Sequence, residues 1–326
     1  MRRRRLGRTD LDVPAIGFGC GMVGGLMVGG TPADQREAVA RALDAGIDYF
    51  DTAPFYGGGR SEENLGRALK ALGRRALVGT KVRIEPAVRD DAQEMQSLGD
   101  LVRRSVEDSL RRLGVEHVDL LQLHNPVSGA RDGSGLAQQA ILEQVLPAFR
   151  RMVEEGKVRR IGMTALGNDA DARAVIAQGV FDTAQVSYSL LDRVAARAPG
   201  GLLHEAAKRG TGVIGIRVLA GGSLSGSVQR HPAAMQKVIP LGTGIGSGAD
   251  YAADVACARR FHWLADGASL AAAAIRYGLS QPHVHTLAIG FSSLGQLDEA
   301  IEAERAGPFD PATLDRVAQL QTELGL

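Results

Sequence analysis

The sequence predicts an α/β protein, a (β/α)8 TIM barrel formed by residues 1–326 as a single domain. Eight short apolar segments of strand length alternate with amphipathic segments of helix length from one end of the chain to the other. Each apolar segment is nearly continuous in hydrophobic residues, as expected for parallel strands that are buried on both faces. Hydrophobic residues make up 44% of the chain, which allows a large core. We find no linker-like break and no internal repeat beyond this alternation.

The predicted strands are the apolar runs, and the predicted helices fill the segments between them. Segment 32–46 places Ala38, Val39 and Ala42 on one face and ends at Gly46, a residue that favours helix termination. Segment 61–73 opens with Ser61, a suitable N-cap. The strands are predicted at 15–19, 49–52, 76–82, 118–124, 159–165, 183–189, 213–219 and 286–290, and the other helices at 98–114, 137–155, 169–179, 201–209, 251–265, 268–280, 294–306 and 311–324.

An open, doubly wound sheet is the alternative arrangement for alternating strands and helices. Such a sheet binds a dinucleotide at a GxGxxG motif that opens a helix, and Gly19, Gly21 and Gly24 have this spacing. The motif is a weak signal in a chain with 42 glycines. The loop that follows is long, and no acidic residue closes a strand about 20 residues further on. The sequence therefore favours the barrel.

Charge and cysteine content exclude several classes of protein. The 38 basic and 37 acidic residues leave a net charge of +1, which argues against nucleic acid or a membrane surface as a partner. The basic cluster Arg2–Arg5 is typical of a solvated strand edge. Two cysteines form no disulfide framework and no zinc motif, so we expect a reducing, cytoplasmic location. The uncharged segment Val13–Gly30 contains seven glycines, which predicts a strand and a loop instead of a membrane span.

Polar residues follow several of the predicted strands. Asp51, Lys81, His124 and Thr164 lie at strand ends, and Tyr56 lies in a glycine-rich loop. Individually, each has a structural explanation, such as a turn cap, a solvent-directed lysine or an exposed loop aromatic. The loops at the carboxyl ends of barrel strands open onto one face, and charged groups there are costly to bury unless paired. As a set they indicate a functional site at this face of the barrel. The predicted strands six to eight contribute Gln185, Arg217 and Gly290 to the same face.

Such a set suits proton transfer to a carbonyl oxygen. A tyrosine has a pKa of about 10 and is a poor proton donor and acceptor near neutrality unless it is assisted. A lysine ammonium lowers the pKa of a neighbouring phenol, and a carboxylate keeps that lysine charged in a poorly solvated site. A neutral histidine can orient and polarise the carbonyl. We expect protonation of the oxygen as hydride arrives at the carbon.

The segment DYFDTAPFYGGGRSEENLGRAL (48–69) closely resembles the signature of the aldo-keto reductase family. VGTKV (78–82) and HVDLLQLHNP (117–126) resemble the family's lysine and histidine motifs. The resemblance implies a barrel with an N-terminal β-hairpin cap and extra C-terminal helices, and an NAD(P)-dependent oxidoreductase acting on a small aldehyde, ketone or sugar. It implies Tyr56 as general acid and base, Asp51 and Lys81 as the groups that tune it, and His124 as the group that orients the substrate.

The resemblance also implies a cofactor site. Thr164 stands where the family usually has Ser-Asn at the nicotinamide carboxamide, Gln185 matches a second carboxamide contact, and Ile216 replaces an aromatic that stacks on the ring. Loop 222–226 matches the segment that covers the pyrophosphate. The remaining residues expected at the cofactor are Gly19, Cys20, Arg217, Leu219, Gly221, Gly222, Ser223, Gly290, Ser292, Gln296 and Glu299.

The sequence leaves the choice between NADP(H) and NAD(H) open. NADPH-preferring members of the family commonly have Arg or Lys in the adenosine loop, whereas Ser292 and Ser293 stand there in this chain. The missing charge favours NAD(H). Serine hydroxyls and the N-terminus of the next helix can also hold a phosphate.

The substrate is expected to be small or polar. Loops 21–30, 125–135 and 223–249 should line the substrate cleft, and they are rich in Gly and Ser and poor in aromatic residues. Gly21, Phe55 and Asn125 are the expected contacts. The residues at Thr164 and Ile216 resemble those of the family's aldose and galactose dehydrogenases, which oxidise a sugar lactol with NAD. A general aldehyde reductase is the alternative.

Two other classes of protein remain as alternatives. One is a cofactor-binding regulatory subunit that resembles the potassium-channel β-subunits, although no membrane-partner interface is recognisable. The other is a metal-dependent barrel hydrolase that uses Asp51, Asp119 and His124. Metal sites of this kind need several ligands at neighbouring strand ends, and His124 is the one histidine of seven that ends a predicted strand. We therefore expect no metal, while the oligomeric state is left open.

Overall fold

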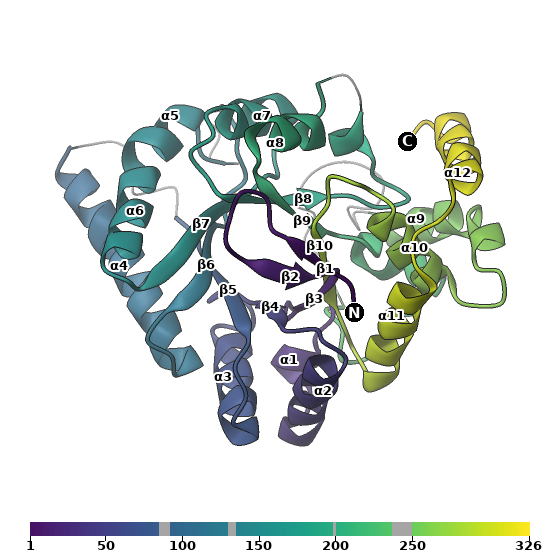
Figure 1. Cartoon of the computed structure of the whole chain (residues 1–326), viewed down its shortest axis with the longest axis horizontal. Helices are drawn as coiled ribbons and strands as arrows, with labels where there is room; N and C mark the ends of the chain where they lie inside the picture. The colour runs from purple at the N-terminus through teal and green to yellow at the C-terminus, as the bar shows by residue number, and fades with distance from the viewer. Residues whose placement is uncertain (85–91, 130–134, 198–199, 237–249) are drawn as a thin grey trace.

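The computed structural model describes residues 1–84, 92–129, 135–197, 200–236 and 250–326. Eight parallel strands form a closed barrel with helices around it, which confirms the predicted fold (Figure 1). All eight predicted strands are present. They are β3 (Ile16–Gly19), β4 (Tyr49–Asp51), β5 (Leu77–Val82), β6 (Val118–Leu123), β7 (Val158–Thr164), β8 (Thr183–Ser187), β9 (Gly212–Ile216) and β10 (Thr286–Gly290).

The barrel strands pair in chain order from β3 to β9, and β10 lies between β9 and β3. Ile16 of β3 pairs in register with Leu287 of β10, so the first and last barrel strands close the ring. The predicted strand 213–219 is too long, because β9 ends at Ile216. The next residue, Arg217, has φ of 57°, a left-handed conformation that ends the extended backbone.

The helices lie outside the barrel and bury their apolar faces against it (Figure 1). Short helical segments also occur at Leu26–Gly29 (α1), Gln138–Ala140 (α5), Ile141–Val145 (η2, a π-helix), Val194–Ala196 (η3), Ala220–Ser225 (η4) and His262–Leu264 (η5). The longer helices are α2 (Pro32–Asp44), α3 (Arg60–Leu72), α4 (Ala92–Leu113), α6 (Leu146–Glu154), α7 (Asp169–Ala177), α8 (Leu202–Arg209), α9 (Tyr251–Arg259), α10 (Leu270–Leu279), α11 (Leu294–Ala306) and α12 (Pro311–Glu323).

Ser61 is not the N-cap of α3, which corrects the sequence prediction. The helix begins one residue earlier, after Gly59, whose φ is 94° and which offers no side-chain cap. Ser61 is instead fully buried in the first turn. Its hydroxyl lies 2.8 Å from the Cys20 carbonyl oxygen and 2.8 Å from the Thr52 hydroxyl. The start of α3 is thereby fixed to the loops that follow β3 and β4.

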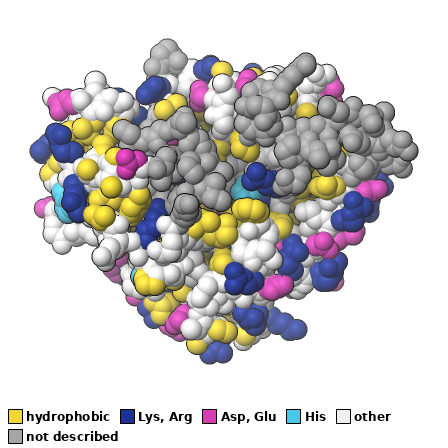
Figure 2. Space-filling model, turned by 180° about the vertical axis from the view of Figure 1, so that it is seen from behind, with side chains coloured by type: hydrophobic (Ala, Val, Ile, Leu, Met, Phe, Trp, Pro, Cys, Tyr) yellow, Lys and Arg dark blue, Asp and Glu magenta, His cyan; other side chains and the backbone are white. Residues whose placement is uncertain are grey.

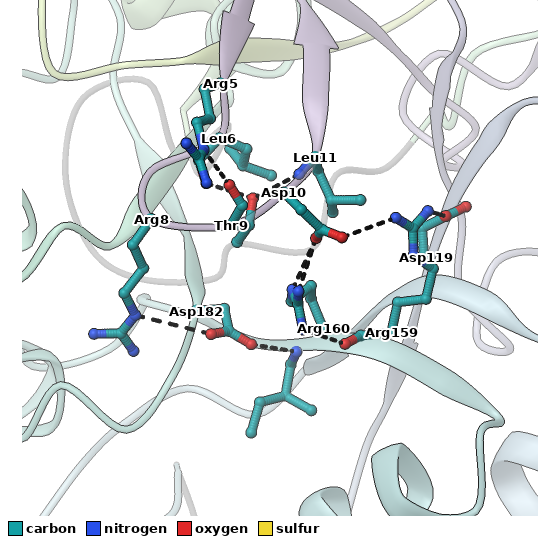
Figure 3. A network of polar contacts seen from close by, with 11 residues as sticks. Arg5, Leu6, Arg8, Thr9, Asp10, Leu11, Asp119, Arg159, Arg160 and Asp182 are labelled. Atoms are coloured by element: carbon teal, nitrogen blue, oxygen red, sulfur yellow. Dashed lines mark hydrogen bonds and ion pairs between the residues drawn. The ribbon is translucent and has the colours of Figure 1, made fainter.

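A β-hairpin of β1 (Arg3–Arg5) and β2 (Asp12–Pro14) closes the N-terminal end of the barrel, as predicted (Figure 1). Its turn is held by ion pairs to residues at the beginning of β7 and before β8 (Figure 3). Asp10 lies 3.2 Å from Arg159 and 2.9 Å from Arg160, and Arg8 lies 3.9 Å from Asp182. Beneath the turn, a small apolar cluster comprises Leu6, Leu11, Val13, Tyr49, Leu120 and Ile214.

The side chains of the basic cluster Arg2–Arg5 form ion pairs and hydrogen bonds with other parts of the protein. Arg2 pairs with Glu304 at 2.8 Å, and Arg3 pairs with Asp12 and Asp48. Arg4 and Arg5 donate to backbone carbonyls. On the opposite side of the molecule, basic and acidic side chains are interspersed (Figure 2). Among the described helices, none has the length and apolar character required to span a bilayer.

Candidate active site

The site lies at the carboxyl end of the barrel strands. Asp51 is the last residue of β4, Lys81 is the penultimate residue of β5, and His124 follows β6 directly. Tyr56 lies in the turn between β4 and α3. The three glycines after it, 57–59, all have positive φ, which lets the chain reverse tightly toward α3. The structure therefore brings the four residues predicted to be catalytic to one face.

Lys81 connects the other groups. Its ammonium nitrogen lies 2.5 Å from Asp51 Oδ2, 2.8 Å from the Thr52 carbonyl oxygen and 3.1 Å from the Tyr56 hydroxyl. These three contacts use all three of its N–H donors. The lysine side chain is 1% exposed, so its charge depends on these partners.

The pKa of Lys81 and the pKa of Tyr56 are both raised. Burial, the largest influence, lowers the pKa of Lys81, but Asp51 and Tyr56 together outweigh it. Burial is also the largest influence on Tyr56 and raises the pKa of the phenol. Lys81 lowers the pKa of Tyr56, as the sequence led us to expect, but this effect is smaller than that of burial. The phenol therefore remains protonated at neutral pH and Lys81 remains cationic.

His124 faces Tyr56 across the site. The two rings meet edge to face, with centroids 5.8 Å apart. Burial, followed by the charges of Lys81 and Arg83, lowers the pKa of His124 to about 3. The imidazole is therefore neutral at physiological pH, the state in which it can donate one hydrogen bond without carrying a charge.

Asp51 has more partners than the sequence predicted. Its Oδ1 accepts hydrogen bonds from Gln185 at 2.7 Å, Gln122 at 3.2 Å and Tyr49 at 3.3 Å. Tyr49 and Gln122 were not predicted as site residues. The signal that identifies them is the two-residue period of a strand, because Tyr49 shares a face with Asp51 and Gln122 shares a face with His124.

A cavity of about 730 Å³ opens beside Tyr56 and His124 and extends toward the start of α11. It is lined by Asp51 and by most of the residues predicted to contact the cofactor. These are Gly19, Thr164, Gln185, Ile216, Arg217, Leu219, Gly221, Gly222, Gly290, Ser292, Gln296 and Glu299, together with Gly21, which was predicted to contact the substrate.

Besides Lys81, which is 1% exposed, four predicted site residues do not line this cavity. Cys20 and Ser223 are buried, and the Ser223 hydroxyl donates to the Ala220 carbonyl. Asn125 uses its side-chain amide to bind the backbone of Ile84, at 2.8 Å and 2.7 Å, so in this structure it fixes a loop. Phe55 is 49% exposed near Arg83, at the surface.

The cavity also has lining residues that the sequence prediction did not name individually. Arg230 and Tyr251 come from segments on either side of residues 237–249, which lie outside the described residues and contain part of a predicted substrate loop. The Arg230 guanidinium lies 4.2 Å from the centre of the Tyr251 ring, and the Tyr251 hydroxyl donates to the Ser227 carbonyl. The segment before the gap is also held by a bond from Met235 N to Met22 O.

The cavity residues fit a nicotinamide dinucleotide. The Thr164 hydroxyl is buried without a hydrogen-bond partner in the described part of the chain, which suits a ligand amide. Gly221 and Gly222 have φ of 67° and 105°, so backbone without side chains faces the cavity between Leu219 and Ser225. The volume also falls within the range of about 300–1,000 Å³ that is usual for ligand sites.

The residue set proposed for a metal-dependent hydrolase is not brought together. Asp119 lies at the second residue of β6, near the hairpin end of the barrel. Its carboxylate accepts a hydrogen bond from Val78 N. It also accepts one from Arg159, and both of these side chains are drawn in Figure 3. Asp51 and His124 both lie at the other end of the barrel, at the carboxyl ends of β4 and β6. The structure therefore offers no support for the hydrolase alternative.

The fold is an eight-stranded parallel barrel, and its candidate site lies at the carboxyl ends of the strands. A family model described as the aldo/keto reductase family matches residues 15–322, and the chain belongs to this family. The protein is therefore an oxidoreductase.

Curated relatives and solved structures agree with this assignment. The chain is 31% identical over 318 residues to an L-galactose dehydrogenase from Arabidopsis thaliana, an alignment that covers 92% of this chain and 87% of the relative. It is 32% identical to a D-threo-aldose 1-dehydrogenase from a Pseudomonas species, with coverage of 67% and 70%. The structure of a glycerol dehydrogenase from Gluconobacter oxydans is similar with a TM-score of 0.74 and 25% identity, covering 98% of this chain and 95% of that one.

Proposed function

We propose that this chain is an NAD(P)-dependent oxidoreductase that interconverts a carbonyl and an alcohol, with Tyr56 as general acid in reduction and general base in oxidation. The observation that carries the proposal is the continuous contact from Asp51 through Lys81 to the Tyr56 hydroxyl. A fully buried lysine that contacts both a carboxylate and a phenol is typical of a site that transfers protons.

Each residue has a defined part in the proposed reaction. In reduction, Tyr56 donates its hydroxyl proton to the substrate oxygen, and Lys81 stabilises the phenolate that forms. Asp51 keeps Lys81 protonated in the buried site. Neutral His124 donates a hydrogen bond that orients the same oxygen. A bound nicotinamide cofactor would supply the hydride-transfer chemistry.

The cofactor would be held by the part of the cavity that extends from Tyr56 and His124 toward the start of α11. Thr164 and Gln185 line this part of the cavity and would bind the carboxamide, and Ile216 would pack against the ring. The side-chain-free backbone at Gly221 and Gly222 would allow the pyrophosphate to approach closely. Arg217 also lines the cavity and adds a positive charge that favours a phosphate.

Contacts at the start of α11 support a preference for NAD(H). The Gln296 side chain accepts from Ser292 N, the Ser292 hydroxyl donates to the Gly24 carbonyl, and Ser293 caps the helix. These groups are therefore already engaged within the protein. Neither Lys nor Arg occurs between Leu294 and Ile301, and Glu299 contributes a negative charge to the cavity. A 2′-phosphate would gain no cationic partner from this helix.

The substrate class that we propose is a small polar carbonyl or the lactol of an aldose. Two relatives are named for L-galactose and D-threo-aldoses. The cavity wall near the Arg230 segment includes Ser225, Ser227 and Gln229, which can hydrogen-bond hydroxyl groups.

Replacing Tyr56 with Phe tests the proposal directly. We expect kcat to fall by at least about a hundredfold, the usual scale for loss of a general acid. The dissociation constant of the nicotinamide cofactor, measured by protein fluorescence, should change by less than about threefold, because the hydroxyl makes no predicted contact with it. Tyr277→Phe is the matched control, because Tyr277 is buried against Tyr188 and does not line the cavity.

Retention of turnover in Tyr56→Phe within about threefold of the wild type would contradict the proposal. A wild-type protein that binds the cofactor but turns over neither sugars nor aldehydes in a substrate panel would favour the regulatory-subunit alternative.

A further inference from the structure

The interior of the barrel directly beneath the site contains two polar side chains with no role in the proposed mechanism. They are Tyr49 and Gln122, which are 2% and 0% exposed, and both donate to Asp51 Oδ1. We propose that Tyr49 and Gln122 are positioning residues, which hold Asp51 as a carboxylate so that its other oxygen pairs with Lys81. This inference rests on the proposed function, because it acts through the same lysine and tyrosine.

Tyr49 occupies a space that the neighbouring strands leave open for it. A Cβ atom at Gly17 of β3 would lie 2.5 Å from Tyr49 Cδ1, and one at Gly79 of β5 would lie 2.9 Å from the Tyr49 hydroxyl. Larger residues at either position would therefore displace the ring. The glycines on both sides allow the phenol to cross the barrel interior and reach Asp51 from below.

The Tyr49 hydroxyl can act only as a donor to Asp51. Burial, followed by the charge of Asp51, raises the pKa of this phenol well above its ordinary value. The group therefore stays protonated throughout the pH range in which the protein is folded. No other side-chain hydrogen bond of Tyr49 is found among the described residues.

Gln122 is oriented by its bond to Asp51. Its amide nitrogen lies 3.2 Å from Oδ1, while its amide oxygen is buried without a partner in the described part of the chain. A buried polar atom without a partner disfavours folding, and an apolar side chain of the same size would avoid that cost. The amide is therefore explained by the hydrogen bond that it donates.

These donors act on Tyr56 through the ion pair. The groups facing Asp51 are Lys81, Gln185, Tyr49 and Gln122, with Tyr56 and Cys20 close enough to interact electrostatically. With fewer donors on Oδ1, the carboxylate would attract the Lys81 proton more strongly. The ammonium would then stabilise the Tyr56 phenolate less, which raises the pKa of Tyr56 and slows its action as a base.

The test uses Tyr49→Phe, Gln122→Met and the double variant, assayed as full-length protein in the oxidation direction. We expect kcat to fall about tenfold in each single variant, the scale of losing a hydrogen bond to a charged group, and further in the double variant. The pH at which oxidation reaches half its maximum should rise by at least about 0.5 unit. The cofactor dissociation constant should stay within about twofold of the wild type.

Ile214→Val is the matched control, because Ile214 belongs to the same buried cluster as Tyr49 and makes no polar contact with Asp51. A role confined to packing predicts that all variants lose stability while kcat and the pH profile stay at the control's values, and that result overturns the inference. If Tyr49→Phe does not fold, the kcat and the pH profile of Gln122→Met alone test the inference. If Tyr56→Phe loses activity while Tyr49→Phe and Gln122→Met have normal kinetics, this inference is contradicted and the proposed function still holds.

Discussion

At the scale of single residues, the buried pair of Lys81 and Asp51 determines what the site can do. Both side chains are almost completely buried, and their nearest atoms are 2.5 Å apart. Removing two charges from water is costly, and their attraction offsets that cost only with good geometry and further hydrogen bonds. Asp51 receives those further bonds from Gln185 and from two residues beneath the site. These contacts are the further hydrogen bonds that a buried ion pair requires.

Replacing Lys81 with Met should therefore destabilise the protein as well as inactivate it. We expect the free energy of unfolding to fall by about 3 kcal/mol, because the buried Asp51 charge loses its partner. Adding Asp51→Asn removes that charge, so the double variant should regain part of the stability while remaining inactive. Urea unfolding at pH 7 measures both effects. A Lys81→Met protein that is as stable as the wild type would contradict this account.

The four residues at the centre of the site were predictable because strand ends and a family motif both indicate them. Tyr49 and Gln122 were not predicted, because the sequence does not show which side chains meet inside the barrel: Tyr49 lies on the same strand as Asp51, and Gln122 reaches it from β6, across β5. Asn125 was expected at the substrate, whereas the structure uses its amide to hold the backbone at Ile84. Its proximity to His124 in sequence did not reveal where its side chain points.

At the scale of elements, the N-terminal turns of α11 bear on the choice of cofactor. A single substitution there tests the proposed preference for NAD(H). Gln296 is exposed and lines the cavity, so Gln296→Arg would add the missing positive charge. We expect the ratio of kcat/KM for NADPH to that for NADH to rise at least about tenfold, the scale of a charged hydrogen bond.

Gln296→Met is the control, since it removes the same contact with Ser292 without adding charge. An equal change in both variants would show that the lost contact, and not the new charge, is responsible. A wild-type enzyme that already prefers NADPH would contradict the proposed preference itself.

Element boundaries were less predictable than the elements. The start of α3 and the end of β9 both depend on single residues with positive φ, Gly59 at 94° and Arg217 at 57°. A glycine beside a suitable N-cap allows two starts, and a non-glycine residue with positive φ has no reliable signal in the sequence. The strands and helices themselves follow from hydrophobic periodicity, which one such residue does not alter.

At the scale of the whole molecule, His124 links stability to pH. Its pKa is about 3 in the folded protein and about 6.5 when unfolded. Well above pH 6.5, His124 is unprotonated in both the folded and the unfolded state, so the full stability is present. As the pH falls below about 6.5, the unfolded chain binds a proton that the folded protein does not, and stability is lost at up to about 1.4 kcal/mol per pH unit.

Urea unfolding at pH 7.5, 6.0 and 5.0 measures this dependence. The wild type should lose more stability than His124→Asn over this range, because the variant has no proton to bind at this position. His285, whose pKa is also lowered by burial, contributes a background that is common to both proteins. Parallel pH dependence in the two proteins would contradict the assignment to His124.

The pairing of β10 with β3 has a consequence for how the protein is made. These strands come from opposite ends of the chain, so the ring cannot close until residues 286–290 have left the ribosome. Until then, the nascent sheet has two edges with unpaired backbone groups, at which other chains can add. Growing polypeptides of this kind associate with one another unless they are shielded. We expect efficient expression to depend on chaperones that shield these edges.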